Sequence, residues 1–133
     1  MAKREKKKSF QEALEIPETT VLDENPSVAG LRVSLDEIKA FEGVKGYIMR
    51  NTTSAAIDLN DPSKIIDYAI LSSSAFDATQ ELAPIFELGD AKEILVEGKN
   101  AKMLSVVTDG NKISIFMKKN VDCEKILKKL HIA

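Results

Sequence analysis

The sequence predicts an α/β (α+β) fold in which a five-stranded antiparallel sheet is sandwiched between helices, in the order α-β-β-α-β-β-β-α. Three observations support this. A long helical stretch with start and stop signals occupies residues 61–89, and the apolar pattern then changes to the short segments typical of strands. A one-sided apolar stripe closes the chain at residues 123–130.

The bulk composition is that of one globular domain. The chain has 133 residues, 44% hydrophobic and 30% charged, with no run of about 18 apolar residues that would predict a transmembrane helix. No apolar segment follows the charged start, so no secretory signal is expected. The single cysteine, Cys123, cannot form an internal disulfide and favours a cytoplasmic location.

The charge is unevenly distributed along the chain. Residues 1–8 carry five basic side chains against Glu5, whereas the remainder is acidic, at about −6. We expect residues 1–33 to form a mobile basic N-terminal extension and residues 34–133 to form the folded domain. An acidic body argues against specific nucleic-acid binding, and leaves the 1–8 tail a possible weak contact with an anionic surface.

The first helix of the domain is predicted by a capping box. Ser34 and Glu37 have the spacing at which each side chain reaches the other's backbone N–H, and Val33 and Ile38 occupy the two staple positions. The helix is expected to run to about residue 42. Strands over 45–51 and 54–59 should follow as a hairpin, although no Asn-Gly or Asp-Gly turn joins them.

The long helix has clear end signals. Asp61 is a candidate N-cap, Pro62 suits the first helical position, and Gly89 suits a left-handed residue after the last turn. Pro84 removes one helical hydrogen bond, which predicts a kink or a break that leaves the last residues as a separate turn.

This helix carries two apolar rows, about 60° apart at roughly 100° per residue. The second row is covered either by the rest of the chain or by a second copy or partner protein, and we favour the latter. The row expected on the sheet is Ile65, Ala69, Ser72, Phe76, Thr79, Ala83 and Phe86. The second row is Tyr68, Leu71, Ala75, Ala78, Leu82 and Ile85.

Strands are expected over 92–98, 102–107 and 112–118, and Asp109-Gly110 is a strong two-residue hairpin turn. Their apolar residues point to both faces, so both faces of the sheet must be covered. The last helix should begin near Asn120 or Asp122. Its buried stripe is Cys123, Ile126, Leu127 and Leu130.

Nothing in the sequence predicts an enzyme, a metal site or a cofactor. His131 is the only histidine and has no nearby ligand, and no phosphate-binding glycine motif occurs. Asp77 and Glu81 could share a helix face as an acidic pair, but solvated charge explains them better. The mid-helix serines 72–74 have no histidine partner for catalysis.

The order of elements, taken with several short motifs, resembles the roadblock / dynein light chain family. The motifs are Gly43-Val44-Lys45-Gly46, Leu88-Gly89, Ile94-Leu95-Val96-Glu97-Gly98, Val107-Thr108-Asp109-Gly110 and Asn120-Val121. The likeness covers about residues 34–130. The chain departs from the family at Asn51-Thr52-Thr53-Ser54, where Asp-Gly is common.

The resemblance implies a non-enzymatic dimeric scaffold that docks a Ras-like small GTPase and modulates or localises it. Strand 92–97 would pair with its symmetry mate, or with a related chain in a heterodimer, beneath paired long helices. The implied dimer interface is Tyr68, Leu71, Ala75, Ala78, Leu82, Glu93, Ile94, Leu95 and Val96. The expected partner-binding positions are Asp67, Ser74, Asp77 and Glu81.

A second reading remains open. Sheets of this kind also occur in PAS-like and profilin-like modules, so the chain could be a small-molecule sensor or an adaptor. The aliphatic interior expected here offers few polar groups to orient a ligand, which argues against a sensor.

Overall fold

The computed structural model describes residues 26–87, 89 and 92–130, and confirms the predicted fold class. Residues 1–25 of the extension expected over residues 1–33, which include the basic tail, lie outside the described residues, as do Leu88 and His131. The helices are α2 (Pro26–Lys39), a 3-10 turn η1 (Pro62–Lys64), α3 (Ile65–Ile85) and α4 (Cys123–Lys129). The strands are β1 (Val44–Arg50), β2 (Ala55–Leu59), β3 (Glu93–Glu97), β4 (Ala101–Thr108) and β5 (Asn111–Lys118).

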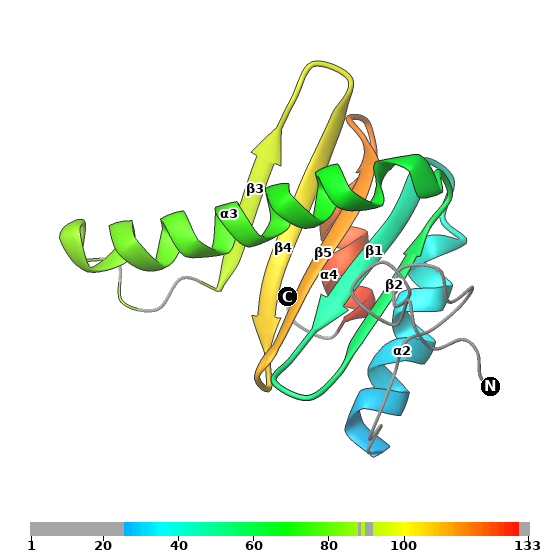
Figure 1. Ribbon diagram of the computed structural model, residues 1–133. Helices are drawn as coiled ribbons and strands as arrows, with labels where there is room; N and C mark the ends of the chain where they lie inside the picture. Colours follow the sequence, from blue (N-terminus) through cyan, green and yellow to red (C-terminus); the bar gives the residue numbers. More distant parts are fainter. Residues whose placement is uncertain (1–25, 88, 90–91, 131–133) are drawn as a thin grey trace.

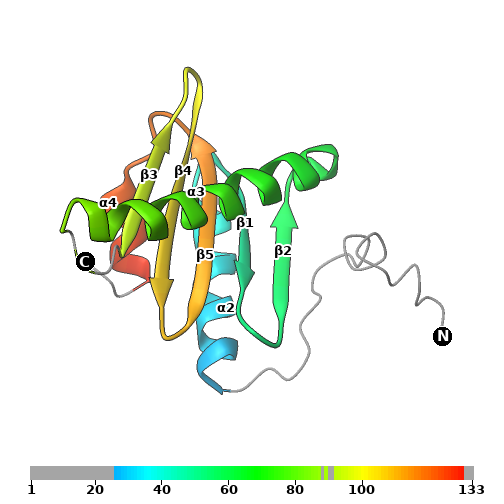
Figure 2. The ribbon, with the colours of Figure 1, turned by 60° about the vertical axis from the view of Figure 1, so that its left-hand side comes forward.

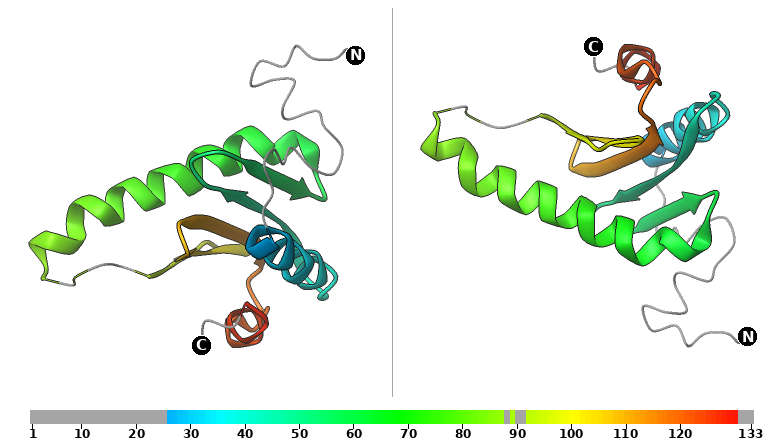
Figure 3. Two further views of the ribbon diagram at one scale, coloured as in Figure 1. Left: turned by 90° about the horizontal axis from the view of Figure 1, so that it is seen from below. Right: turned by 90° about the horizontal axis from the view of Figure 1, so that it is seen from above.

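The sheet has the order β2-β1-β5-β4-β3, and each neighbouring pair is antiparallel. Helix α3 crosses one face, and α2 and α4 lie on the other (Figures 1 and 2). Viewed along the layers, the sheet separates the long helix from the two shorter helices (Figure 3). Strands β2 and β3 form the two edges, so α3 runs from above one edge to the other.

Each face of the sheet has its own core. Beneath α2 and α4, the core includes Leu35, Ile38, Ile113 and Ile126, which are fully buried. Beneath α3, the core is smaller and contains Ile48, Leu59, Met103 and Phe116. Both faces are therefore covered, as the apolar residues on both sides of the strands predicted.

The predicted start of the first helix at Ser34 is wrong, because α2 begins at Pro26. The capping box lies inside the helix, where Glu37 instead pairs with Lys129 of α4 at 2.6 Å. Val33 is 58% exposed and makes no staple. Leu31, from the stretch expected to be an extension, packs against the core beneath α2.

The long helix starts as predicted but ends earlier. The Asp61 carboxylate caps η1 by accepting a hydrogen bond from the Ser63 amide at 3.1 Å. Helix α3 passes through Pro84, where a kink or a break was expected, and ends one residue later at Ile85, followed by a turn at residues 86 and 87. The left-handed residue directly after the last turn is Glu87, with φ of 58°. Gly89 has the expected left-handed conformation, with φ of 68°, but it lies two residues further on, so only its predicted position at the end of the helix is wrong.

The two hairpin connections differ in chemistry. Asp109 and Gly110 both have positive φ, as a tight two-residue turn requires. The first hairpin is closed by the Asn51 side chain, whose Oδ1 accepts from the amides of Thr53 and Ser54, both at 2.9 Å. This side-chain turn replaces the absent Asp-Gly signal.

Candidate interaction surface

Helix α3 is longer than the width of the sheet it covers. Its C-terminal turns project past the edge strand β3, where no strand lies beneath them (Figures 1 and 3). Leu82, Ile85 and Phe86 on this overhang are 48%, 70% and 65% exposed. Burying three such side chains would contribute several kcal/mol, at about 25 cal/mol per Å² of apolar surface. The overhang is therefore an apolar surface that lacks a cover among the described residues.

Strand β3 beside the overhang has one side without a neighbouring strand in the described chain. The Gly98 amide donates to the Ala101 carbonyl at 2.8 Å, and the Val107 amide donates to the Lys92 carbonyl at 3.2 Å. Lys92 and Gly98 therefore direct backbone groups toward β4. Since hydrogen bonding alternates along an antiparallel pair, the N–H and C=O groups of residues 93, 95 and 97 point outward.

The two faces of β3 also differ in their side chains. Ile94 and Val96 are half-buried on the α3 face, where Val96 packs against the core beneath the helix. Leu95 points to the opposite face and is 49% exposed, although its cross-strand neighbour Leu104 is buried. An apolar strand with open hydrogen-bonding groups is a template for pairing with another strand.

The surface of α3 that faces away from the sheet is acidic. The helix carries three acidic residues and no basic residue. Asp67, Ser74, Asp77 and Glu81 are all exposed, and the carboxylates make no ion pair with other described residues. The four expected partner-binding positions therefore share one exposed ridge.

Two solved structures share this architecture. A Roadblock/LC7 domain from Streptomyces avermitilis superposes with a TM-score of 0.63 and 11% identity, over 75% of this chain and 88% of that one. The gliding protein mglB from Thermus thermophilus superposes with a TM-score of 0.63 and 15% identity, over 83% of this chain and 86% of that one. The chain has a roadblock-type fold. No protein-family model matches the sequence, and no curated protein matches it either.

In this roadblock fold, the sheet-facing row of α3 was predicted correctly except at one end. Ser72, Phe76 and Ala83 are buried, and Ile65, Ala69 and Thr79 are half-buried. Phe86 was expected on the sheet, but it lies on the overhang and is exposed.

The second row of the roadblock helix divides into two groups. Tyr68 and Ala75 pack against the core beneath α3, and the Tyr68 ring stacks on Phe116 with centroids 4.3 Å apart. Leu71, Ala78, Leu82 and Ile85 are exposed. Only the second group is free to meet another chain without rearrangement.

Sequence reasoning missed a second exposed apolar pair on the helix. Ile66 and Ile70 are 50% and 60% exposed, on the flank opposite Leu71 and Leu82 by the 100° rule. Their i, i+4 spacing could have shown that they lie side by side on one face of the helix. They lie next to the acidic ridge, and so belong to the same outward-facing surface.

The helix is fixed to the roadblock sheet by specific contacts at its centre. The Ser72 hydroxyl lies 2.6 Å from that of Ser114, which lies 2.7 Å from that of Ser105, and all three are buried. One turn later, the Phe76 ring contacts the cations of Arg50 and Lys112, at 5.9 and 5.7 Å from the ring centroid. These contacts fill the space between α3 and the sheet and set the position of the overhang.

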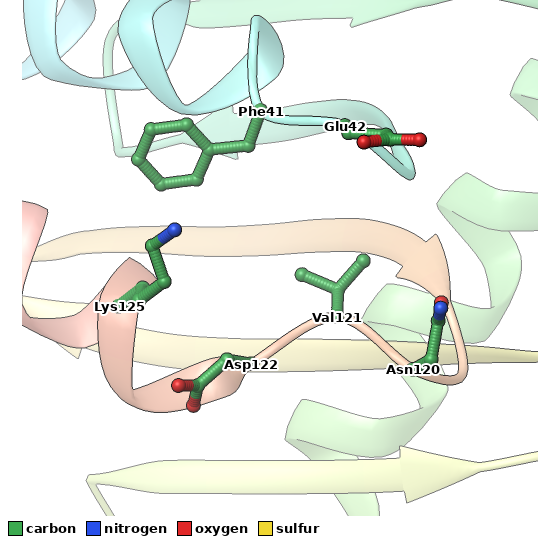
Figure 4. Close-up of a pocket in the computed structure, with 6 residues that line it drawn as sticks. All are labelled: Phe41, Glu42, Asn120, Val121, Asp122 and Lys125. Carbon is green, nitrogen blue, oxygen red and sulfur yellow. The ribbon is translucent and has the colours of Figure 1, made fainter.

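A surface hollow of about 390 Å³ lies on the other side of the sheet, between the turn after α2 and the start of α4 (Figure 4). The Lys125 ammonium sits over the Phe41 ring, 5.5 Å from its centroid. Glu42 and Asp122 line the same hollow, and Asp122 caps α4 by accepting from the Glu124 amide. The hollow is remote from α3 and β3.

The described residues contain no group of three or more His, Cys, Asp or Glu side chains placed to hold a metal ion. Cys123 is half-buried on the apolar stripe of α4, as a small core residue would be. In the described part of the chain, no helix is long and apolar enough to cross a membrane.

Proposed function

We propose that the protein is a non-enzymatic dimeric platform that docks a Ras-like small GTPase on its α3 surface. The observation that carries the proposal is the geometry at one edge of the sheet. Helix α3 projects past β3 with Leu82, Ile85 and Phe86 exposed, and the edge beneath it offers open backbone groups.

A second roadblock-type chain would complete both features at once. If its β3 paired with this β3, the sheet would continue beneath the overhang, and the exposed side chains of α3 would meet the α3 layer of the partner. A two-fold axis perpendicular to the sheet keeps both long helices on the same face. The paired helices would then present one broad outer surface formed by two acidic ridges.

The docking of a GTPase would use that outer surface. The ridge formed by Asp67, Ser74, Asp77 and Glu81 is exposed, and the neighbouring Ile66 and Ile70 add apolar area. Interfaces of standard size bury about 800 Å² on each partner and combine an apolar centre with a polar rim. The α3 surface has both components.

The small-molecule sensor is less well supported by the contacts. A ligand between α3 and the sheet would have to displace the Ser72, Ser114 and Ser105 hydroxyl chain or the stacked Tyr68 and Phe116 rings. The hollow of Figure 4 lies outside that layer.

Sedimentation velocity tests the dimer. The variant Leu82→Asp/Ile85→Asp should sediment as a monomer at concentrations where the wild type is a dimer, because each new carboxylate would be buried without a partner. Ile66→Asp is the control, since it changes another exposed isoleucine of the same helix but should leave the dimer intact. A wild type that stays monomeric at hundreds of micromolar would rule out pairing of this edge with a second copy of the chain.

Docking is tested with purified Ras-like GTPases from the same organism, loaded with GDP or a GTP analogue. Asp77→Lys and Glu81→Lys should weaken GTPase binding at least tenfold while the dimer persists. Glu124→Lys, an exposed carboxylate on α4, makes the same charge change on the opposite side of the sheet and should have no effect. The absence of binding by any GTPase in either nucleotide state would overturn the docking proposal and leave the dimer unaffected.

A further inference from the structure

The outward-facing residues of β3 restrict how two copies of this edge can pair. Residues 93, 95 and 97 present their backbone groups to the open side, and their side chains share the face that carries α2 and α4. A two-fold axis perpendicular to the sheet keeps each side chain on its own face. In such a pair, the residue on the axis lies opposite the same residue of the second copy. Only registers with residue 94, 95 or 96 on the axis pair most of the strand.

The register centred on Leu95 satisfies the most groups. It places Leu95 opposite Leu95 of the second copy, and residue 93 opposite residue 97 on both sides, so all three outward-facing residues of both strands form hydrogen-bonded pairs. On the α3 face it also places Ile94 opposite Val96 of the second copy. The other two registers leave one outward-facing residue of each strand beyond the end of the other strand.

This register brings carboxylates together. Glu93 would lie opposite Glu97 of the second copy, and the two-fold axis repeats the contact. Directly opposed residues in such pairs have Cβ atoms about 4.5–5.5 Å apart, and like charges there are destabilising. The self-paired edge therefore combines a favourable apolar centre with two repulsive ends.

In each Glu93–Glu97 contact, a basic residue of the same chain lies opposite only one of the two carboxylates. Glu97 has Lys102 opposite it on β4, whereas Glu93 has Val106. Neither Glu93 nor Glu97 makes an ion pair with another described residue, so only the nearby Lys102 offsets the repulsion, and only at Glu97. Each contact of the self-paired edge would thus hold two carboxylates and one ammonium group.

We propose that β3 selects its pairing partner by charge, so that a roadblock-type chain with a basic residue opposite Glu93 binds more tightly than a second copy of this chain. This inference rests on the proposed dimer but is separable from it. The preferred partner carries an apolar strand edge with a lysine or arginine at the position that Glu97 occupies here. Self-pairing is the weaker alternative, limited by the two Glu93–Glu97 contacts.

Charge exchange in the full-length protein tests the proposal. Glu93→Lys converts both contacts into opposite-charge pairs without placing a lysine opposite another lysine of its own chain, because Glu93 faces Val106. Its dimer dissociation constant, measured by sedimentation equilibrium, should fall roughly 10- to 100-fold relative to the wild type. Glu93→Lys/Glu97→Lys restores like charges and should self-pair no better than the wild type.

The wild type mixed with the Glu93→Lys/Glu97→Lys variant should form a heterodimer more tightly than either chain pairs with itself. Salt provides an independent readout, since screening weakens both signs of interaction. The wild-type dimer should tighten as salt rises, and the Glu93→Lys dimer should weaken. Glu124→Lys is the control for net charge. Introduced into the wild type or into Glu93→Lys, it should leave the dimer dissociation constant unchanged.

Register is checked by crosslinking. With Cys123→Ser to remove the native thiol, Leu95→Cys should form an intermolecular disulfide under mild oxidation, because two residues on the axis have Cα atoms about 5.5 Å apart. A dimer that forms but ignores Glu93→Lys, or that fails to crosslink at residue 95, overturns the charge selection alone. The absence of any dimer in the wild type, Glu93→Lys or the mixture overturns the proposed pairing itself.

Discussion

The hydroxyl of Ser72 on α3 lies 2.6 Å from that of Ser114 on β5, beside the apolar core beneath the helix. Ser114 also lies 2.7 Å from Ser105 on β4, so one hydroxyl joins the helix to two strands. The chain of hydroxyls fixes where α3 sits along the sheet, because a slide of one helical turn would leave buried hydroxyls without partners. It therefore determines how far the helix projects past β3.

Ser114→Ala should lower the free energy of unfolding by about 2–3 kcal/mol, because it leaves two buried hydroxyls without their shared partner. Urea denaturation measures this loss. Ser74→Ala, at an exposed position of α3, is the control and should stay within about 0.5 kcal/mol. Replacing all three buried serines by alanine should cost less than the sum of the single changes, and additive costs would show that the hydroxyls act independently.

Gly46 occupies a position in β1 where a side chain has no room. Its φ is 142°, and a Cβ there would lie 2.2 Å from the Asp58 carbonyl oxygen and 2.6 Å from the Leu59 Cα. Both clashes are with backbone of the neighbouring strand, which cannot move without breaking the pairing. Gly46→Ala should therefore cost about 3 kcal/mol or more.

Gly30→Ala is the matched control for that change. Gly30 lies inside α2, and nothing lies within 4 Å of the added Cβ. Alanine is the better helix former by about 0.5–1 kcal/mol, so this variant should be more stable than the wild type. Equal effects of the two changes in thermal unfolding would contradict the strand geometry around Gly46.

The sheet and its turns could be predicted because their signals are local. Asp109-Gly110 specifies its turn by backbone conformation alone, and the stripe of α4 repeats at helical spacing. The start of α2 could not be located this way. The pair Ser34 and Glu37 matches a capping box, but Glu37 pairs with Lys129, which is 92 positions further along the chain.

The sequence predicted which side of α3 faces the sheet, but not how far the helix extends past the edge of the sheet. The row through Ser72, Phe76 and Ala83 follows from periodicity, which finds the buried side of a helix. Periodicity cannot show where the sheet beneath the helix ends, so Phe86 was expected to be covered. Tyr68 was assigned to the second row, but it is turned toward the sheet by stacking on Phe116, a contact between residues 48 positions apart.

The end of α3 offers a stabilising substitution. Glu87 has φ of 58° directly after the last turn, a conformation that costs a non-glycine residue roughly 1 kcal/mol or more. Glu87→Gly removes this cost, but the flexibility of glycine in the unfolded chain offsets part of the gain. The free energy of unfolding should therefore rise by a few tenths to about 1 kcal/mol. Glu87→Ala keeps the strained conformation while removing the charge, and a gain of the same size there would assign the effect to charge.

The phenol of Tyr47 gives the protein a distinctive response to alkaline pH. Tyr47 is buried in the core beneath α2, and its hydroxyl donates to the Asp36 carboxylate at 2.7 Å. Burial, followed by this hydrogen bond and the charge of Asp36, raises the pKa of Tyr47 well above its ordinary value of 10.0. The neutral phenol is therefore favoured in the folded state, and its contribution to stability is complete below pH 10 and lost as the pH rises further.

Tyr47→Phe separates this contribution from the background. Below pH 9 the variant should be less stable by about 1.5–3 kcal/mol, the range for a hydrogen bond to a charged group. Above pH 10 the advantage of the wild type should shrink by about 1.4 kcal/mol per pH unit, because unfolding then releases a proton from the phenol. Urea denaturation of both proteins from pH 8 to 11 measures the difference, in which the titration of lysines common to both cancels. A difference that stays constant across this range would show that the phenol ionises as readily in the folded protein as in the unfolded chain.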